Sequence, residues 1–121
     1  MNLKVEFINI EENNRDLIVS FAISDSDNGV NSLILHRQLF LEFIMPDEER
    51  GVKVSYNDVP FEQEEFNMLN SVKITKSEIS IKSTHREYTL NVSNLAANDI
   101  DHIVKLLKKQ NYDNRFIIQI D

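Results

Sequence analysis

The stretch that decides the fold runs from residue 72 to residue 92 and reads VKITKSEISIKSTHREYTLNV. Its apolar residues alternate with polar ones in three short runs: Val72 and Ile74, then Ile79 and Ile81, then Tyr88, Leu90 and Val92. This period-two alternation is typical of half-buried strands. The connections at residues 75–78 and 83–86 are too short for parallel crossovers. The stretch therefore predicts three consecutive antiparallel strands.

The N-terminal part of the chain carries the same alternation. Apolar residues occupy every second position from Leu3 to Phe7, and they continue at Ile8 and Ile10 after a change of phase. Residues 17–23 alternate again, after a polar run at residues 11–14 that is typical of a turn. Two strands joined by a short polar turn predict a hairpin.

Residues 33–45 are the most apolar part of the chain. A single strand would place these side chains on one face: Leu39, Leu41, Phe43 and Met45, with Phe40 and Ile44 on the other. Apolar residues on both faces indicate a central buried strand, from which Glu42 points outward. A short buried helix is the alternative, because a dense apolar run does not separate strand from helix by its period. Residues 46–51 then turn the chain into another strand at residues 52–56.

The period changes near the C-terminus. Apolar residues fall at helical spacing at Ile100, Ile103, Val104, Leu106 and Leu107. This spacing predicts a helix near residues 96–110, with Asn98 as the N-cap. We expect Ile103 and Leu106 to face the sheet. Residues 116–120 are predicted to add one more strand.

These elements together predict the fold class. Strands followed by one helix indicate an α+β fold, an antiparallel β-sheet of six to eight strands with one principal C-terminal helix packed on it. The chain has only two glycines and two prolines, and no linker-like stretch divides it. We therefore predict that residues 1–121 form a single domain.

Few residues in the chain suggest catalytic chemistry. The absence of cysteine excludes thiolate metal sites and cysteine nucleophiles, and two glycines are too few for a phosphate-binding loop or a dinucleotide fingerprint. The three histidines, His36, His85 and His102, are isolated and share no metal-binding spacing. Residues 25–29 begin like a calcium loop, but their glycine is in the wrong register. We expect no enzyme activity, no catalytic residues, no cofactor and no metal.

The sequence also bears on location. Residues 1–6 lack the basic start and apolar core of a signal peptide. The longest apolar run is interrupted by Glu42 and is far shorter than the roughly 20 residues of a membrane span. A chain without cysteine suits a reducing compartment. We expect a cytoplasmic protein that does not bind membranes.

The charge is concentrated in the middle of the chain. The net charge is −7, and residues 42–65 hold eight acidic residues against only Arg50 and Lys53, a net charge of −6. This segment would repel nucleic acid and anionic membranes and attract a basic protein surface. We therefore predict a basic protein partner and no direct contact with nucleic acid. The alternative is a solvated acidic loop that keeps the protein soluble.

Four pieces of the chain share a pattern with a known family. Residues 33–37 read LILHR, residues 47–51 read DEERG, residues 52–58 read VKVSYND and residues 70–81 read NSVKITKSEISI. On these pieces, residues 33–81 resemble immunity protein family ten of bacterial polymorphic toxin systems. His36 and Val59 stand where the family has glutamine. The resemblance implies a small cytoplasmic protein that binds and blocks a toxin.

The resemblance and the charge lead to one functional hypothesis, an immunity protein that occludes the active site of its toxin with an acidic surface. The candidate partner-binding residues are Asp47, Glu48, Glu49, Tyr56, Asp58, Phe61, Glu62, Glu64 and Glu65. Tyr56 and Phe61 would be the anchors. The alternative is a structural or adaptor module without enzyme activity, such as a homodimer joined through sheet edges. A third reading is an enzyme of an unfamiliar type.

Overall fold

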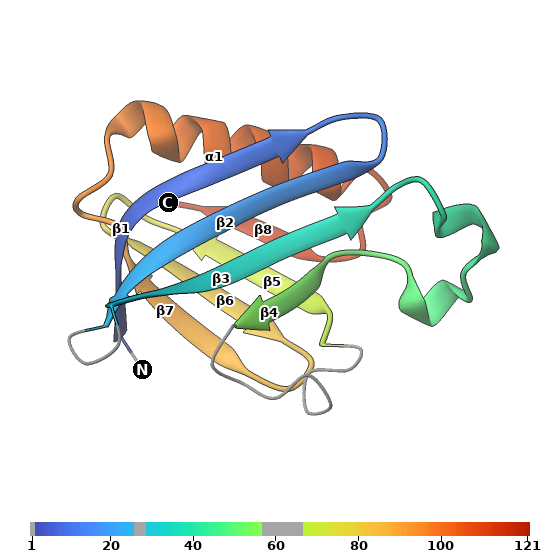
Figure 1. Ribbon diagram of the computed structural model, residues 1–121, viewed down its shortest axis with the longest axis horizontal. Helices are drawn as coiled ribbons and strands as arrows, with labels where there is room; N and C mark the ends of the chain where they lie inside the picture. The colour runs from blue at the N-terminus through green and yellow to red at the C-terminus, as the bar shows by residue number, and fades with distance from the viewer. Residues whose placement is uncertain (1, 26–28, 57–66) are drawn as a thin grey trace.

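The computed structural model describes residues 2–25, 29–56 and 67–121, and the ribbon in Figure 1 shows the order of their elements. The strands are β1 (Asn2–Glu12), β2 (Asp16–Asp25), β3 (Gly29–Gln38), β4 (Lys53–Tyr56), β5 (Leu69–Ile74), β6 (Glu78–Ser83), β7 (Glu87–Asn91) and β8 (Ile117–Ile120). The helices of the described residues are α1 (Ala97–Gln110) and two 3₁₀-helices, η1 (Glu42–Ile44) and η2 (Asp47–Glu49).

The eight strands form one sheet in the order β4-β3-β2-β1-β7-β6-β5-β8. The β1–β2 hairpin and the β5–β6–β7 meander are antiparallel, which confirms both predictions. The prediction of a purely antiparallel sheet is wrong, because β1 pairs with β7 and β5 pairs with β8 in parallel. Both parallel pairs join segments far apart in the sequence, and α1 supplies the crossover that precedes β8. Alternation along one strand carries no information about such distant partners.

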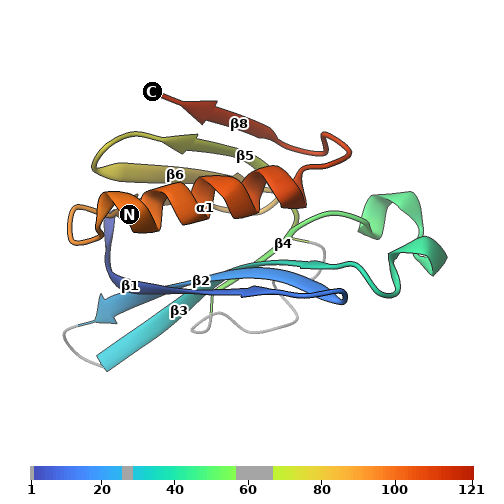
Figure 2. The ribbon, with the colours of Figure 1, turned by 90° about the horizontal axis from the view of Figure 1, so that it is seen from above.

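Strand β1 joins two layers of the sheet. Its first residues, Asn2 to Lys4, pair with β7, whereas the rest of the strand pairs with β2. The register shifts between Val5 and Phe7, and an irregularity of this kind bends a strand. Seen from above, β1, β2 and β3 lie in one layer and β5, β6 and β8 in the other (Figure 2). The sheet therefore encloses a core between its own halves.

Strand β4, at one end of the sheet, also contacts the start of β5, which lies next to the last strand at the other end. The N–H of Val54 in β4 donates to the carbonyl of Asn67 at 2.8 Å, and the N–H of Leu69 in β5 donates to the carbonyl of Val52 at 2.8 Å. Helix α1 lies along the open side between the two layers (Figures 1 and 2). These contacts leave the core covered on most sides.

Helix α1 closes the core with one apolar face. Ile103 and Leu106 are buried, as predicted from their spacing, and Leu107 is buried with them. The predicted helix is confirmed, but the prediction of Asn98 as N-cap is wrong. The N-cap is Ala96, whose N–H donates to the carboxylate of Asp99 at 3.3 Å. The helix begins at Ala97, so Asn98 lies within its first turn, and the Asp99 side chain at the third helical position binds the backbone of the N-cap.

Residues 33–45 do not form a single central strand, so that prediction is wrong. Strand β3 ends at Gln38, and the chain continues through η1 and η2 before it enters β4. The predicted short helix is nearer to the observed η1, yet η1 exposes its apolar residues instead of burying them. The inward side of η1 is taken by Glu42, whose carboxylate forms a buried ion pair with Arg37.

Candidate partner-binding site

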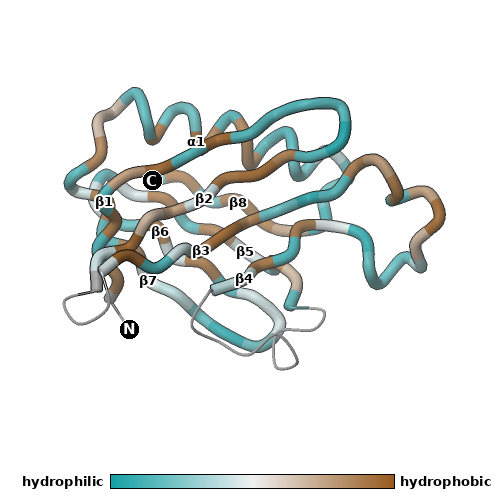
Figure 3. Tube along the Cα trace, in the orientation of Figure 1, coloured by the Kyte–Doolittle hydropathy of each residue, from teal (hydrophilic) through white to brown (hydrophobic). Residues whose placement is uncertain are grey.

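The segment between β3 and β4 extends beyond the rest of the molecule. We call residues 39–50 the projection; it is the blue-green to green segment at the right of Figures 1 and 2. Phe43 is 76% exposed and Ile44 is 65% exposed, and the hydropathy colouring shows a brown stretch there, away from the core (Figure 3). The same segment carries the acidic residues Asp47, Glu48 and Glu49 in η2. The projection thus presents apolar and acidic side chains together.

Arg37 anchors the projection from inside the protein. Its side chain lies at the end of β3 and is 0% exposed. The guanidinium donates two hydrogen bonds to the carboxylate of Glu42, from Nε at 2.7 Å and from Nη2 at 2.6 Å. This bidentate geometry is the strongest that an arginine makes with a carboxylate. Glu42 is only 7% exposed, so the prediction that it points outward from a strand is wrong.

The same guanidinium binds the end of α1 and the turn that follows it. Arg37 Nη1 donates to the carbonyl of Gln110 and to the carboxylate of Asp113, both at 2.7 Å. Its guanidinium carbon lies 4.1 Å from the centre of the Tyr112 ring, and the Tyr112 hydroxyl donates to Glu42 at 2.8 Å. One buried cation therefore joins β3, the projection and the C-terminal end of α1.

Gln110 reinforces the attachment of α1. Its side chain is buried, and its Nε2 donates to the carbonyl of Leu17 in β2 at 2.9 Å and to the carbonyl of Leu35 in β3 at 3.1 Å. These bonds connect the helix to the strand that carries Arg37. The base of the projection is consequently fixed by backbone as well as side-chain groups.

A second arginine holds the far part of the projection. Arg115 Nη2 donates to the carboxylate of Asp47 at 2.7 Å, and its Nη1 donates to the Asp47 carbonyl at 2.9 Å. Arg115 Nε also donates to Asp113 at 2.6 Å. Within the projection, Arg50 Nε donates to the carbonyl of Met45 at 3.1 Å. Asp113 thus links the two arginines, and the projection is tied down at both η1 and η2.

The electrostatics of this cluster favour its charged form. Burial by itself would raise the pKa of Glu42, but hydrogen bonds from Arg37 and Tyr112 outweigh it and leave that pKa below its ordinary value. Hydrogen bonds from Arg37 hold the pKa of Asp113 well below its ordinary value, against the effect of burial. Burial lowers the pKa of Arg37, yet its bonds to Asp113 and Glu42 raise it further than burial lowers it. All three groups are therefore charged at neutral pH.

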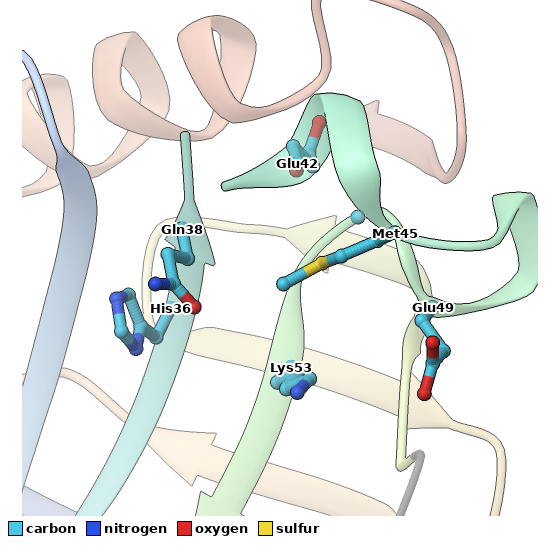
Figure 4. A pocket seen from close by; sticks show the side chains of 7 residues that line it. His36, Gln38, Glu42, Met45, Glu49 and Lys53 are labelled. Atoms are coloured by element: carbon cyan, nitrogen blue, oxygen red, sulfur yellow. The ribbon is translucent and has the colours of Figure 1, made fainter. Parts of the chain in front are cut away.

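A small hollow beside the projection is not suited to a typical ligand. Its lining residues are His36, Gln38, Glu42, Met45, Glu49, Gly51 and Lys53. Its volume is ≈ 80 Å³, well below the roughly 300–1,000 Å³ of common ligand pockets. The Met45 side chain lies across it (Figure 4). Among residues 2–25, 29–56 and 67–121, no three His, Cys, Asp or Glu side chains gather as a metal site would require.

The structure places the described members of the predicted partner-binding set in two different settings. Asp47 and Glu48 are exposed on the projection, and Glu49 is partly exposed there. Tyr56 is 8% exposed, and its ring stacks on Tyr88 with centroids 6.0 Å apart, so it belongs to the core in this conformation. The remaining candidates lie outside the described residues: Asp58, Phe61, Glu62, Glu64 and Glu65.

Sequence reasoning missed the apolar tip and the pair that positions it. The apolar run predicts burial of Phe43 and Ile44, in a central strand or in a short helix, whereas both are exposed. The available signal was a pair of opposite charges, Arg37 and Glu42, five residues apart within a strongly apolar stretch. Charges in such a setting are almost always paired when buried.

Comparisons of the chain with protein-family models, with curated proteins and with solved structures found no match. The resemblance to an immunity-protein family therefore stays a prediction. In the part of the chain that the structure describes, no helix is both long and apolar enough to cross a membrane.

Proposed function

We propose that this chain is a cytoplasmic immunity protein that binds a bacterial toxin and covers a basic active-site cleft with the acidic side of the projection. The observation that carries the proposal is the position of Asp47, Glu48 and Glu49 on a segment that extends beyond the sheet and is held by the buried Arg37–Glu42 pair and by the exposed Arg115–Asp47 pair. A rigid segment loses little conformational entropy when it binds, which favours affinity.

The charge of the projection supports a basic partner. Within the described residues, neither Glu48 nor Glu49 has an ion-pair partner, whereas Asp47 is paired with Arg115. Unpaired exposed carboxylates attract a positively charged surface over a distance of about one Debye length. Toxins that cleave nucleic acid need such a surface to bind their polyanionic substrate. Occlusion of that surface would block the toxin without chemistry.

The first experiment tests the partner. The protein encoded by the reading frame beside this chain's own would be expressed in a bacterial host, alone and together with this chain. We expect growth arrest from the neighbour alone, restored growth on coexpression, and a complex that survives gel filtration. A harmless neighbour, or one that forms no complex with this chain, would contradict the immunity proposal.

The second experiment tests the surface. Glu48→Gln/Glu49→Gln would be compared with Glu78→Gln/Glu87→Gln, which changes the net charge equally at exposed positions on β6 and β7. We expect the first variant to associate more slowly with the toxin at low salt, and the difference to shrink as salt rises. Equal slowing in both variants would indicate only overall charge, and no slowing would place the interface elsewhere.

A second candidate function is a homodimeric adaptor, and the edge of the sheet favours it. Strand β8 is the last strand of the sheet, and its Ile117 and Ile120 are exposed. An uncharged edge strand can pair with a second copy. Sedimentation equilibrium separates the two functions: a dimer that Ile117→Lys dissociates supports the adaptor, and a monomer that binds toxin supports the immunity protein.

A further inference from the structure

The exposed apolar residues of this protein are concentrated in the projection. Nine large apolar residues are exposed in the described part of the chain, and four of them fall within residues 40–44: Phe40, Leu41, Phe43 and Ile44. Scattered exposed apolar residues are ordinary, but a contiguous group marks an interaction surface. Phe40 is partly covered, because the guanidinium carbon of Arg15 lies 4.5 Å from its ring centre. Phe43 and Ile44 remain as the open tip.

The geometry of η1 explains why these two side chains face outward. A 3₁₀-helix has three residues per turn, so positions 42 and 45 share one face and positions 43 and 44 lie on the others. Glu42 is drawn inward by Arg37, and Met45 reaches across the hollow beside β3 and β4 (Figure 4). The inward side of η1 is thus occupied. Phe43 and Ile44, on the other sides of η1, therefore face the solvent.

The charges around the tip select the kind of surface that can cover it. Glu48 and Glu49 lie close in sequence to the tip and have no ion-pair partner among the described residues. Arg50 is the one cation of the projection, and it donates to the carbonyls of Met45 and Phe43, so the unpaired charges near the tip leave an excess of one negative charge. A second copy docking tip to tip would bring acid against acid, and an anionic membrane would repel the same carboxylates. A surface that carries an apolar stripe beside lysine or arginine side chains complements both the apolar tip and the unpaired acids of the projection.

We infer that Phe43 and Ile44 are the apolar anchor of the interface, and that the partner offers an apolar stripe bordered by basic side chains. This inference rests on the proposed function and adds the chemistry of the contact to it. The acids speed the encounter, whereas the anchor determines how long the complex lasts, because steering acts on association and desolvated contacts act on dissociation.

The test uses a defined probe, a fluorescent 18-residue amphipathic helical peptide of leucine and lysine, measured by anisotropy against the full chain. Two matched peptides replace leucine with serine, or lysine with glutamate. We expect the leucine–lysine peptide to bind at least about tenfold more tightly than either one. If the serine–lysine peptide bound as tightly as the leucine–lysine peptide, the contact would depend on charge alone and the apolar anchor would be wrong. A leucine–lysine peptide that did not bind would also overturn the inference.

Variants locate the contact. Phe43→Ser/Ile44→Ser should weaken binding of the leucine–lysine peptide about tenfold or more by faster dissociation, with the salt dependence retained. The matched control is Phe7→Ser/Ile117→Ser, which removes two apolar residues that are 59% and 69% exposed elsewhere, and it should bind like the unaltered protein. Equal losses in both variants would overturn the inference.

A third arm separates failure of the anchor from failure of the proposed function. If Glu48→Gln/Glu49→Gln weakens binding and Phe43→Ser/Ile44→Ser does not, the anchor is wrong and the acidic surface stands. If only the apolar variant weakens binding, the anchor stands and the acidic steering fails. Neutral phosphatidylcholine vesicles complete the test: binding that depends on Phe43 and Ile44 and is stronger than to the peptide would identify a membrane instead and overturn the inference.

Discussion

Strand β3 and the projection that follows it are both rich in apolar residues, yet they bury opposite kinds of side chain. In β3, Leu33 and Leu35 are buried between the layers of the sheet. In the projection, Phe43 and Ile44 are exposed while the carboxylate of Glu42 is buried. The difference shows that hydropathy along the chain does not decide burial here. It is decided by which groups meet in space, since Arg37 finds its partners on the projection and at the end of α1.

The largest effect is expected from removing Arg37, the buried cation that connects β3 to the projection. Arg37→Met would leave Glu42 buried without its partner, and we expect the free energy of unfolding to fall by about 3–5 kcal/mol. Urea unfolding would measure the change. The control is Arg37→Met/Glu42→Leu, which should recover part of the loss because no buried charge remains unpaired. A single variant as stable as the unaltered protein would show that the pair does not hold the projection.

The two apolar regions can be compared directly by truncation. Leu35→Ala should lower the free energy of unfolding by about 2–5 kcal/mol, because it opens a cavity in a packed core. Phe43→Ala should change it by no more than about 0.5 kcal/mol, as is usual for exposed positions. Both values come from urea unfolding at neutral pH. Similar losses for the two variants would mean that the tip of the projection packs against the protein.

The pH dependence of stability tests the ion pairs that Arg37 makes with Glu42 and Asp113. The folded-state pKa values of Glu42 and Asp113 are lowered, so their contribution is fully present above the unfolded values of about 4 and is lost as pH falls toward the folded values. We expect the free energy of unfolding to decline as pH is lowered below about 5. Arg37→Met/Glu42→Leu should decline less steeply. An identical slope in both proteins would contradict this assignment.

The smallest effect is expected at the acidic end of the projection. Glu48→Gln/Glu49→Gln should alter the free energy of unfolding by no more than about 0.5 kcal/mol, because solvated charges contribute little to stability. Thermal unfolding followed by circular dichroism would measure it. A large loss of stability would show that these residues hold the fold, and would remove them as a dedicated binding surface.

Several features of the fold follow from local pattern and were predictable. Alternation with short polar turns specifies the β1–β2 hairpin and the β5–β7 meander. The face to which a strand side chain points, and the length of the turn between two strands, depend only on residues close together in the sequence. Helical spacing specifies α1 and its buried residues Ile103 and Leu106 for the same reason. The concentration of acids that includes Asp47, Glu48 and Glu49 is equally a property of the sequence.

Tertiary structure alone decided the remaining features. The parallel pairs of β1 with β7 and of β5 with β8 depend on where the chain returns after long connections. The burial of Arg37 depends on Gln110 and Asp113, which lie 73 and 76 residues further along the chain. The alternation of residues within β3 cannot reveal partners at that distance. A buried charge is stable only when such partners enclose it. The end of β3, the inward turn of Glu42 and the exposure of Phe43 therefore follow from contacts that exist only in the folded chain.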